Sequence, residues 1–150
     1  MRKVYQRRRI VVRGVGVEWA VASGDIAEAR EGAKNIGQAS IYHRDLMMAC
    51  TQAQRPVEMD KIAREAELSV MREPDPEAWY HLGELMAYCG QKDAAIRLLR
   101  AAIERNHCAY ETLQTDPLLV KLRGTHDFSE LQSAAKQCQH VLVQRYQSSH

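Results

Sequence analysis

Apolar residues recur at helical spacing over most of the chain, and the clearest run lies in residues 76–102. Its first part carries Trp79, Leu82 and Met86 at positions i, i+3 and i+7, which line one face of an α-helix. After a turn glycine, a second stripe follows with a large residue between two small ones: Ala95, Leu99 and Ala102. The pattern predicts two helices packed face to face, which form a hairpin over residues 76–106.

Glycine and proline residues support this hairpin. Gly83 lies inside the first helix, where the missing side chain lets the second helix approach closely. Gly90 suits the left-handed backbone conformation that commonly ends a helix. Pro74 and Pro76 separate the hairpin from the chain before it, because the residue before a proline avoids the helical conformation. Residues 76–106 are therefore predicted to form a unit with sharp ends.

Two weaker hairpins are predicted before this one, over about residues 11–37 and 38–72. In the second of them, Pro56 separates two helical stretches, since proline is tolerated only in the first turn of a helix. Corresponding positions of the three hairpins stand 30 and 36 residues apart, near the period of about 34 residues of one class of two-helix repeat: Ala29, Met59 and Ala95. The chain is predicted to repeat one helical hairpin three times.

Residues 109–146 follow a different pattern, which predicts capping helices. Asp116 followed by Pro117 is typical of a helix start, with a capping side chain and a proline at the first helical position. A last helix is expected to begin near Asp127, with one apolar stripe along it: Phe128, Leu131, Ala134, Ala135, Cys138 and Val141 or Leu142. Such a helix suits the exposed end of a helical stack, which must be covered for solubility.

The hairpin motif resembles the consensus of tetratricopeptide (TPR) repeats, with Met86 where an aromatic residue is usual. The chain after it resembles the end of TPR modules that accompany bacterial protein kinases, adenylate cyclases and winged-helix regulators. The matching residues are Ala102, Tyr110, Leu113, Asp116, Pro117, Leu122, Arg123 and Phe128. The resemblance covers residues 76–132 well and residues 18–70 loosely.

The resemblance implies an all-α fold, a right-handed α-α superhelix of about three hairpins plus C-terminal capping helices. It assigns residues 18–150 to this TPR-like domain and implies a sensory or docking module. The chain lacks a phosphate-binding glycine loop and a kinase-type catalytic loop. It is thus interpreted either as a stand-alone binding protein or as a fragment or regulatory arm of a larger signalling or transcription protein.

Charge is distributed unevenly along the chain. Residues 1–17 hold six basic side chains and no acid, so they carry +6, and residues 18–150 sum to −4 because the total is +2. This basic N-terminal arm is interpreted as an exposed terminus or a partial repeat. Association with nucleic acid or an anionic membrane through the arm is the alternative.

Cysteine and histidine usage predicts neither disulfides nor a metal site. Cys50, Cys89, Cys108 and Cys138 form no CxxC pair, and no secretory signal precedes them, so reduced thiols and a cytoplasmic location are expected. No apolar run is long enough to span a membrane. The six histidines show no HxxxH spacing, so no metal and no cofactor is expected. Cys89 is a candidate accessible thiol, but no base stands beside it, and the chain is expected not to be an enzyme.

The predicted function is therefore binding of another protein or peptide. In TPR-like stacks, the first helix of each hairpin lines a concave groove, and its outward side chains contact the ligand. Tyrosines there offer contact area at low entropic cost, and Glu84 would favour a basic group on the ligand. The Lys, Asn and Arg set that clamps an acidic peptide C-terminus in some TPR proteins is not seen. The predicted partner-binding residues are Arg44, Met48, Glu77, Tyr80, Glu84 and Tyr88.

Overall fold

The computed structural model of the protein describes residues 41–51 and 56–150. Every regular element in these two ranges is helical, which confirms the all-α prediction. The elements are α3 (Ile41–Thr51), α4 (Pro56–Val70), α5 (Pro76–Tyr88), α6 (Lys92–Glu104), α7 (Tyr110–Thr115), the 3-10 helix η2 (Pro117–Leu119) and α8 (His126–Ser148).

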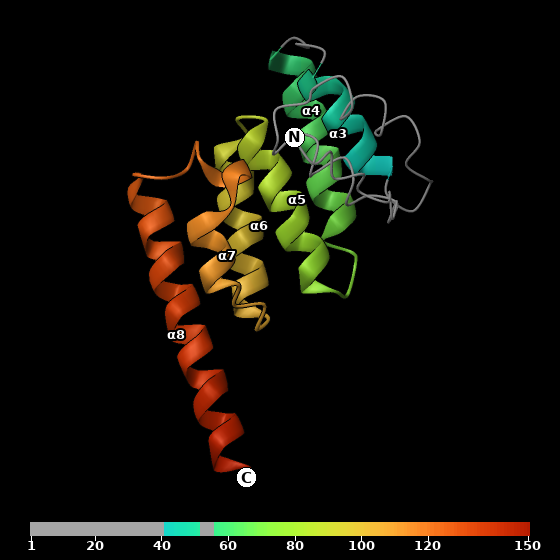
Figure 1. The fold of residues 1–150 in the computed structure, drawn as a ribbon. Helices are drawn as coiled ribbons and strands as arrows, with labels where there is room; N and C mark the ends of the chain where they lie inside the picture. Colours follow the sequence, from blue (N-terminus) through green and yellow to red (C-terminus); the bar gives the residue numbers. More distant parts are fainter. Residues whose placement is uncertain (1–40, 52–55) are drawn as a thin grey trace, which may run out of the picture.

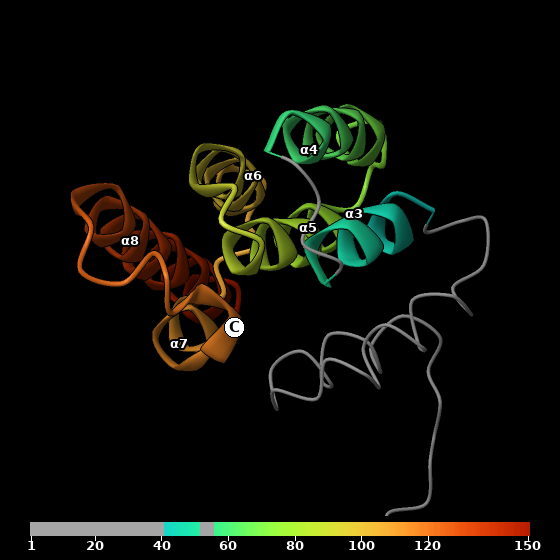
Figure 2. The same ribbon diagram turned by 90° about the horizontal axis from the view of Figure 1, so that it is seen from above.

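The helices form two rows (Figures 1 and 2). Figure 2 shows α3, α5 and α7 in one row, called here the first-helix row, and α4, α6 and α8 in the other. Consecutive helices pair across the rows, as α3 with α4 and α5 with α6, and α7 contacts α8. Helix α5 contacts α3 of the same row and also contacts η2. The core lies between the rows.

The central hairpin has the ends that its sequence predicts. The Asp75 side chain accepts a hydrogen bond from the Glu77 amide at 2.9 Å, and Pro76 takes the first helical position of α5. Gly90 follows the last turn with a φ of +80°, a conformation that costs glycine little. The proline break and the glycine turn are both confirmed.

Close approach of α5 and α6 depends on Gly83. A Cβ atom built on Gly83 would lie 3.0 Å from Cγ and Cδ2 of Leu99, tighter than an ordinary carbon contact. The two predicted stripes face this contact and are buried: Trp79, Leu82, Met86, Ala95, Leu99 and Ala102. The prediction that a glycine permits tight packing of the hairpin is confirmed.

The α3–α4 hairpin lies within the predicted range 38–72, and α4 begins at Pro56 as expected. Buried residues from both helices join the common core: Leu46, Met47, Ala49, Met59, Ala63, Ala66 and Val70. Arg97 of α6 links this hairpin to the next one by donating two hydrogen bonds, of 2.7 and 2.8 Å, to the Glu67 carboxylate of α4. The planar guanidinium group fixes both oxygens at once.

The C-terminal segment covers the end of the stack. Asp116 and Thr125 cap η2 and α8, as Asp116 accepts from the Leu118 amide at 2.8 Å and Thr125 from the Phe128 amide at 3.3 Å. The first half of α8 buries Phe128, Leu131 and Ala135. Figure 1 shows the second half extending past the other helices, and Tyr146 there is 68% exposed. The predicted stripe is thus covered at its start and exposed at its end.

All four cysteines form disulfides, so the expectation of reduced thiols was wrong. Cys50 pairs with Cys89 and Cys108 with Cys138, each with Cα atoms 5.4 Å apart. The bonds join positions 39 and 30 residues apart in sequence. Helix packing brings the two cysteines of each pair together, and the spacing of cysteines along the sequence does not reveal this pairing. Cys89 is therefore not the accessible thiol that the sequence suggested.

The predicted hairpin at 11–37 and the basic arm at 1–17 lie outside the residues that the structure describes. No helix within the described ranges is long and apolar enough to cross a membrane.

Candidate binding face

The first-helix row carries all six residues predicted to contact a partner. Arg44 and Met48 lie on α3, and the other four lie on α5. The Cys50–Cys89 disulfide joins the last turn of α3 to the residue that follows α5, so the two helices lie side by side with their C-terminal ends together. Met48 and Tyr88, each within two residues of this bond, are therefore at the same end of the row.

Two of the six residues are not at the surface. Tyr80 is 2% exposed and Glu84 is 6% exposed. The segment that contains η2 packs against α5, and its Asp116 is itself 9% exposed. Because these contacts come from a segment more than 30 residues away, the face of α5 on which the two side chains lie is covered by the protein's own chain. Glu84 was expected to favour a basic group on the ligand, but its carboxyl group is not exposed to a ligand.

The buried Glu84 has unusual electrostatics. The pKa of Glu84 is raised to about 8, chiefly by burial; the neighbouring Asp116 also raises it, whereas the hydrogen bond with His81 lowers it. His81 Nδ1 lies 3.1 Å from Glu84 Oε2. A carboxyl group with this pKa is mostly protonated at neutral pH, so it can donate a hydrogen bond as well as accept one.

Tyr80 adds a second buried polar group to the same region. Its hydroxyl has no hydrogen-bond partner in the structure. Burial raises the pKa of Tyr80, and the nearby charges of Glu84 and Asp116 raise it further. The phenol is thus a neutral donor next to two carboxyl groups. The His107 ring packs 5.0 Å from the Tyr80 ring, and burial lowers the pKa of His107.

Tyr88 is half-buried and remains reachable from solvent. Lys121 Nζ lies 5.2 Å from the centre of its ring, and the same ammonium group donates a hydrogen bond to the Tyr88 carbonyl oxygen. Met48 is also half-buried and packs against the core. An aromatic ring beside a cationic group, with a flexible thioether on the neighbouring helix, is a combination typical of protein-binding surfaces.

The remaining two predicted residues each have a charged or ionisable neighbour. Arg44 pairs with the adjacent Asp45 at 3.1 Å. Glu77 is exposed near the N-terminal end of α5, and its carboxylate lies 3.5 Å from His81 Nε2. Exposed pairs of this kind contribute about 0–1 kcal/mol each. They therefore leave the side chains available for exchange with a ligand.

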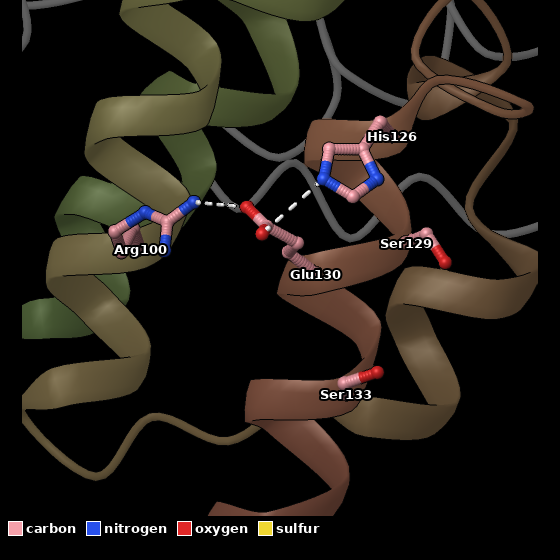
Figure 3. Close-up of a pocket in the computed structure, with 5 residues that line it drawn as sticks. All are labelled: Arg100, His126, Ser129, Glu130 and Ser133. Atoms are coloured by element: carbon pink, nitrogen blue, oxygen red, sulfur yellow. Dashed lines mark ion pairs between the residues drawn. The ribbon is translucent and has the colours of Figure 1, made fainter.

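A shallow depression lies on the opposite row, between α6 and α8 (Figure 3). It has a volume of about 430 Å³ and is lined by Arg100, His126, Ser129, Glu130 and Ser133. Glu130 lies between Arg100, at 3.6 Å, and His126, at 3.4 Å. Its three charged or ionisable side chains are largely exposed and pair with one another. Within the described ranges, no group of three His, Cys, Asp or Glu side chains is placed to hold a metal ion.

The sequence indicated Asp116 as a helix cap and as part of the TPR-like pattern, but not as a neighbour of Glu84, and it did not indicate Lys121. The signal for Asp116 was present, because the Asp-Pro pair predicts a fixed turn before η2. No local pattern indicated that this turn would lie against Glu84, because the contact forms only when two segments about 30 residues apart pack together. Lys121 carries no pattern that links it to Tyr88.

No family model, curated protein or solved structure matches the chain.

Proposed function

We propose that the protein is a non-enzymatic binding module, a short TPR-like right-handed superhelix that recognises another protein through the first-helix row. The proposal retains four of the six predicted residues, Arg44, Met48, Glu77 and Tyr88. The observation that carries it is the half-exposed pair Met48 and Tyr88, at the end of the row where α3 and α5 are joined by a disulfide.

The two-row arrangement supports this proposal. A stack of hairpins presents the same helix of each hairpin on one face, so side chains from several repeats reach one ligand together. Lys121 lies over the Tyr88 ring and adds a positive charge to the face. Because Glu84 is buried, the negative charge that this face presents on α5 comes from the exposed Glu77.

Affinity purification of partner proteins from a lysate of the source cells tests whether the first-helix row binds them. Replacing Met48 and Tyr88 together by alanine is expected to reduce the partner proteins recovered at least tenfold, because hot-spot side chains at interfaces contribute about 2 kcal/mol or more each. The matched control replaces Leu142 and Tyr146 of α8 by alanine, which removes one aliphatic and one aromatic side chain from another surface. Helical circular dichroism must stay unchanged in both variants. Equal recovery by the two variants would contradict the assignment to the first-helix row.

We also propose that the protein works where disulfides persist, in place of the expected cytoplasm. All four cysteines are paired, and structural disulfides of this kind belong to oxidising compartments. Cells lysed directly into a thiol-alkylating maleimide should give unlabelled protein, which becomes labelled at four sites after reduction. Four labelled cysteines without reduction would contradict this proposal and leave the binding proposal intact.

A further inference from the structure

The second half of α8 carries a cluster of exposed apolar side chains, Leu142, Val143 and Tyr146. All of the residues 142–150 are exposed. Leu142 and Tyr146 are four residues apart, so they lie on one face of the helix. That face continues the stripe that α8 buries in its first half: Phe128, Leu131 and Ala135. A helix face that begins in the core therefore extends beyond it with its apolar residues exposed.

The Cys108–Cys138 disulfide holds α8 near the place where it leaves the stack. Cys138 packs against the core, and Cys108 lies in the connection between α6 and α7. The helix continues without a break from Cys138 to Ser148, and Figure 1 shows it extending past the other helices. Because a helix rises about 1.5 Å per residue, this part projects roughly 15 Å. The disulfide and the continuous helix together fix the position of the cluster.

A second cluster of exposed apolar side chains, Leu68 and Met71, lies where α4 ends. The Met71 amide donates to the Glu67 carbonyl oxygen at 3.1 Å, so the helical geometry continues to Met71 and the two side chains share a face. Among the residues that the structure describes, six large apolar side chains are exposed, and five of them belong to the two clusters. Single exposed apolar residues are ordinary, whereas clusters of them mark surfaces that bind.

The two clusters have surroundings of opposite charge. Residues 131–150 hold Lys136 and Arg145 and no acid, which gives +2. Residues 60–77 hold six acids and three basic residues, which gives −3. Three of these acids are exposed in and just after the connection next to Met71: Glu73, Asp75 and Glu77. Opposite charges favour contact between two surfaces and like charges oppose it. The charges therefore favour contact of the α8 cluster with the α4 cluster over contact of two α8 ends.

Every copy of the chain carries both clusters, and both lie toward the same end of the molecule. Figure 1 shows the α4–α5 connection at the end toward which α8 projects. We propose that the protein associates with a second copy of itself, in which the end of α8 of one copy packs on Leu68 and Met71 of the other. Two copies placed end to end can make this contact twice, which gives a closed pair. Self-association through these clusters goes beyond the proposed binding of a partner at the first-helix row.

Sedimentation velocity of the oxidised protein over about a hundredfold range of concentration measures the association. The unsubstituted protein is expected to shift from monomer to dimer as its concentration rises. Leu142→Ser with Tyr146→Ser removes one side of the contact, and Leu68→Ser with Met71→Ser removes the other. Each double variant should dimerise about tenfold or more weakly, because a few central side chains supply most of the binding energy of an interface. Val120→Ser is the matched control, since it removes an exposed apolar side chain outside both clusters and should leave dimerisation unchanged.

A mixture of the two double variants tests which surfaces meet. Each variant keeps the cluster that the other lacks, so the mixture should form a heterodimer more strongly than either variant dimerises alone, as a fluorescent label on one of them detects. A protein that stays monomeric at every concentration would overturn the proposal, and so would a mixture that associates no better than its components. A monomer that binds phosphatidylserine vesicles through the end of α8 would assign that end to an anionic membrane and would also overturn it. These measurements leave Met48 and Tyr88 unchanged and need no partner, so their failure would not bear on the proposed binding function.

Discussion

Loss of either disulfide is expected to lower the free energy of unfolding by about 3–4 kcal/mol. A disulfide restricts the unfolded chain, and the loss grows with the logarithm of the loop that it closes. The loops here span 39 and 30 residues, which places both bonds in that range. Because the two loops do not overlap in sequence, their effects should add approximately. Reduction of both bonds would then remove much of the 5–15 kcal/mol that ordinarily stabilises a protein.

Urea unfolding with and without a reductant measures this effect. Cys50→Ser with Cys89→Ser removes one bond, and Cys108→Ser with Cys138→Ser removes the other. Each of these two double variants should unfold at a lower urea concentration than the unsubstituted, oxidised protein. The variant with all four substitutions is the control, since its midpoint must not respond to the reductant. An unsubstituted protein with the same midpoint in both conditions would contradict the stabilising role of the disulfides.

Gly83→Leu is expected to destabilise the protein by about 2 kcal/mol or more. Even a Cβ atom at this position lies 3.0 Å from Leu99, a residue with no exposed surface. Three further carbon atoms would push α6 away from α5, and overpacking of this kind costs about 1–3 kcal/mol or more. Leucine gains close to 1 kcal/mol in helix propensity over glycine, which offsets only part of the cost.

A double-mutant cycle separates steric overlap from other effects. Leu99→Ala alone leaves a cavity and should cost about 2–5 kcal/mol. In the combined variant the new leucine at position 83 fills part of that cavity, so the two losses should not add. Glu104→Leu on the exposed side of α6 is the control and should change stability by less than about 0.5 kcal/mol. Additive losses, or a Gly83→Leu protein as stable as the original, would contradict the close contact.

The helices were predictable because their signals are local. The α5–α6 hairpin combines a proline start, a glycine turn and two apolar stripes with a small residue at the crossing point. Each feature has one physical explanation, and all of them agree on the same hairpin. The cap at Asp116 is local as well, since its side chain bonds to an amide two residues later.

The candidate site was less predictable than the helices. Periodicity identified Tyr80 and Glu84 as lying on the outward side of α5, but it could not show which other segment packs on that side. A polar residue at an outward position is usually solvated, so burial of Glu84 was not expected. Its pKa is raised first by burial and then by Asp116, which lies 32 residues further along the chain.

Sequence alone was sufficient for the helical class, the hairpin at 76–106 and the starts of the last elements, because each depends on residues within about one repeat. Only the tertiary structure showed which cysteines form the two disulfides, that the segment 116–123 packs on α5, and that the end of α8 is exposed. These features depend on distances between segments 30 or more residues apart, or on which neighbours a helix face meets. Helical periodicity specifies which side chains share a face, and only the docked chain specifies what that face contacts.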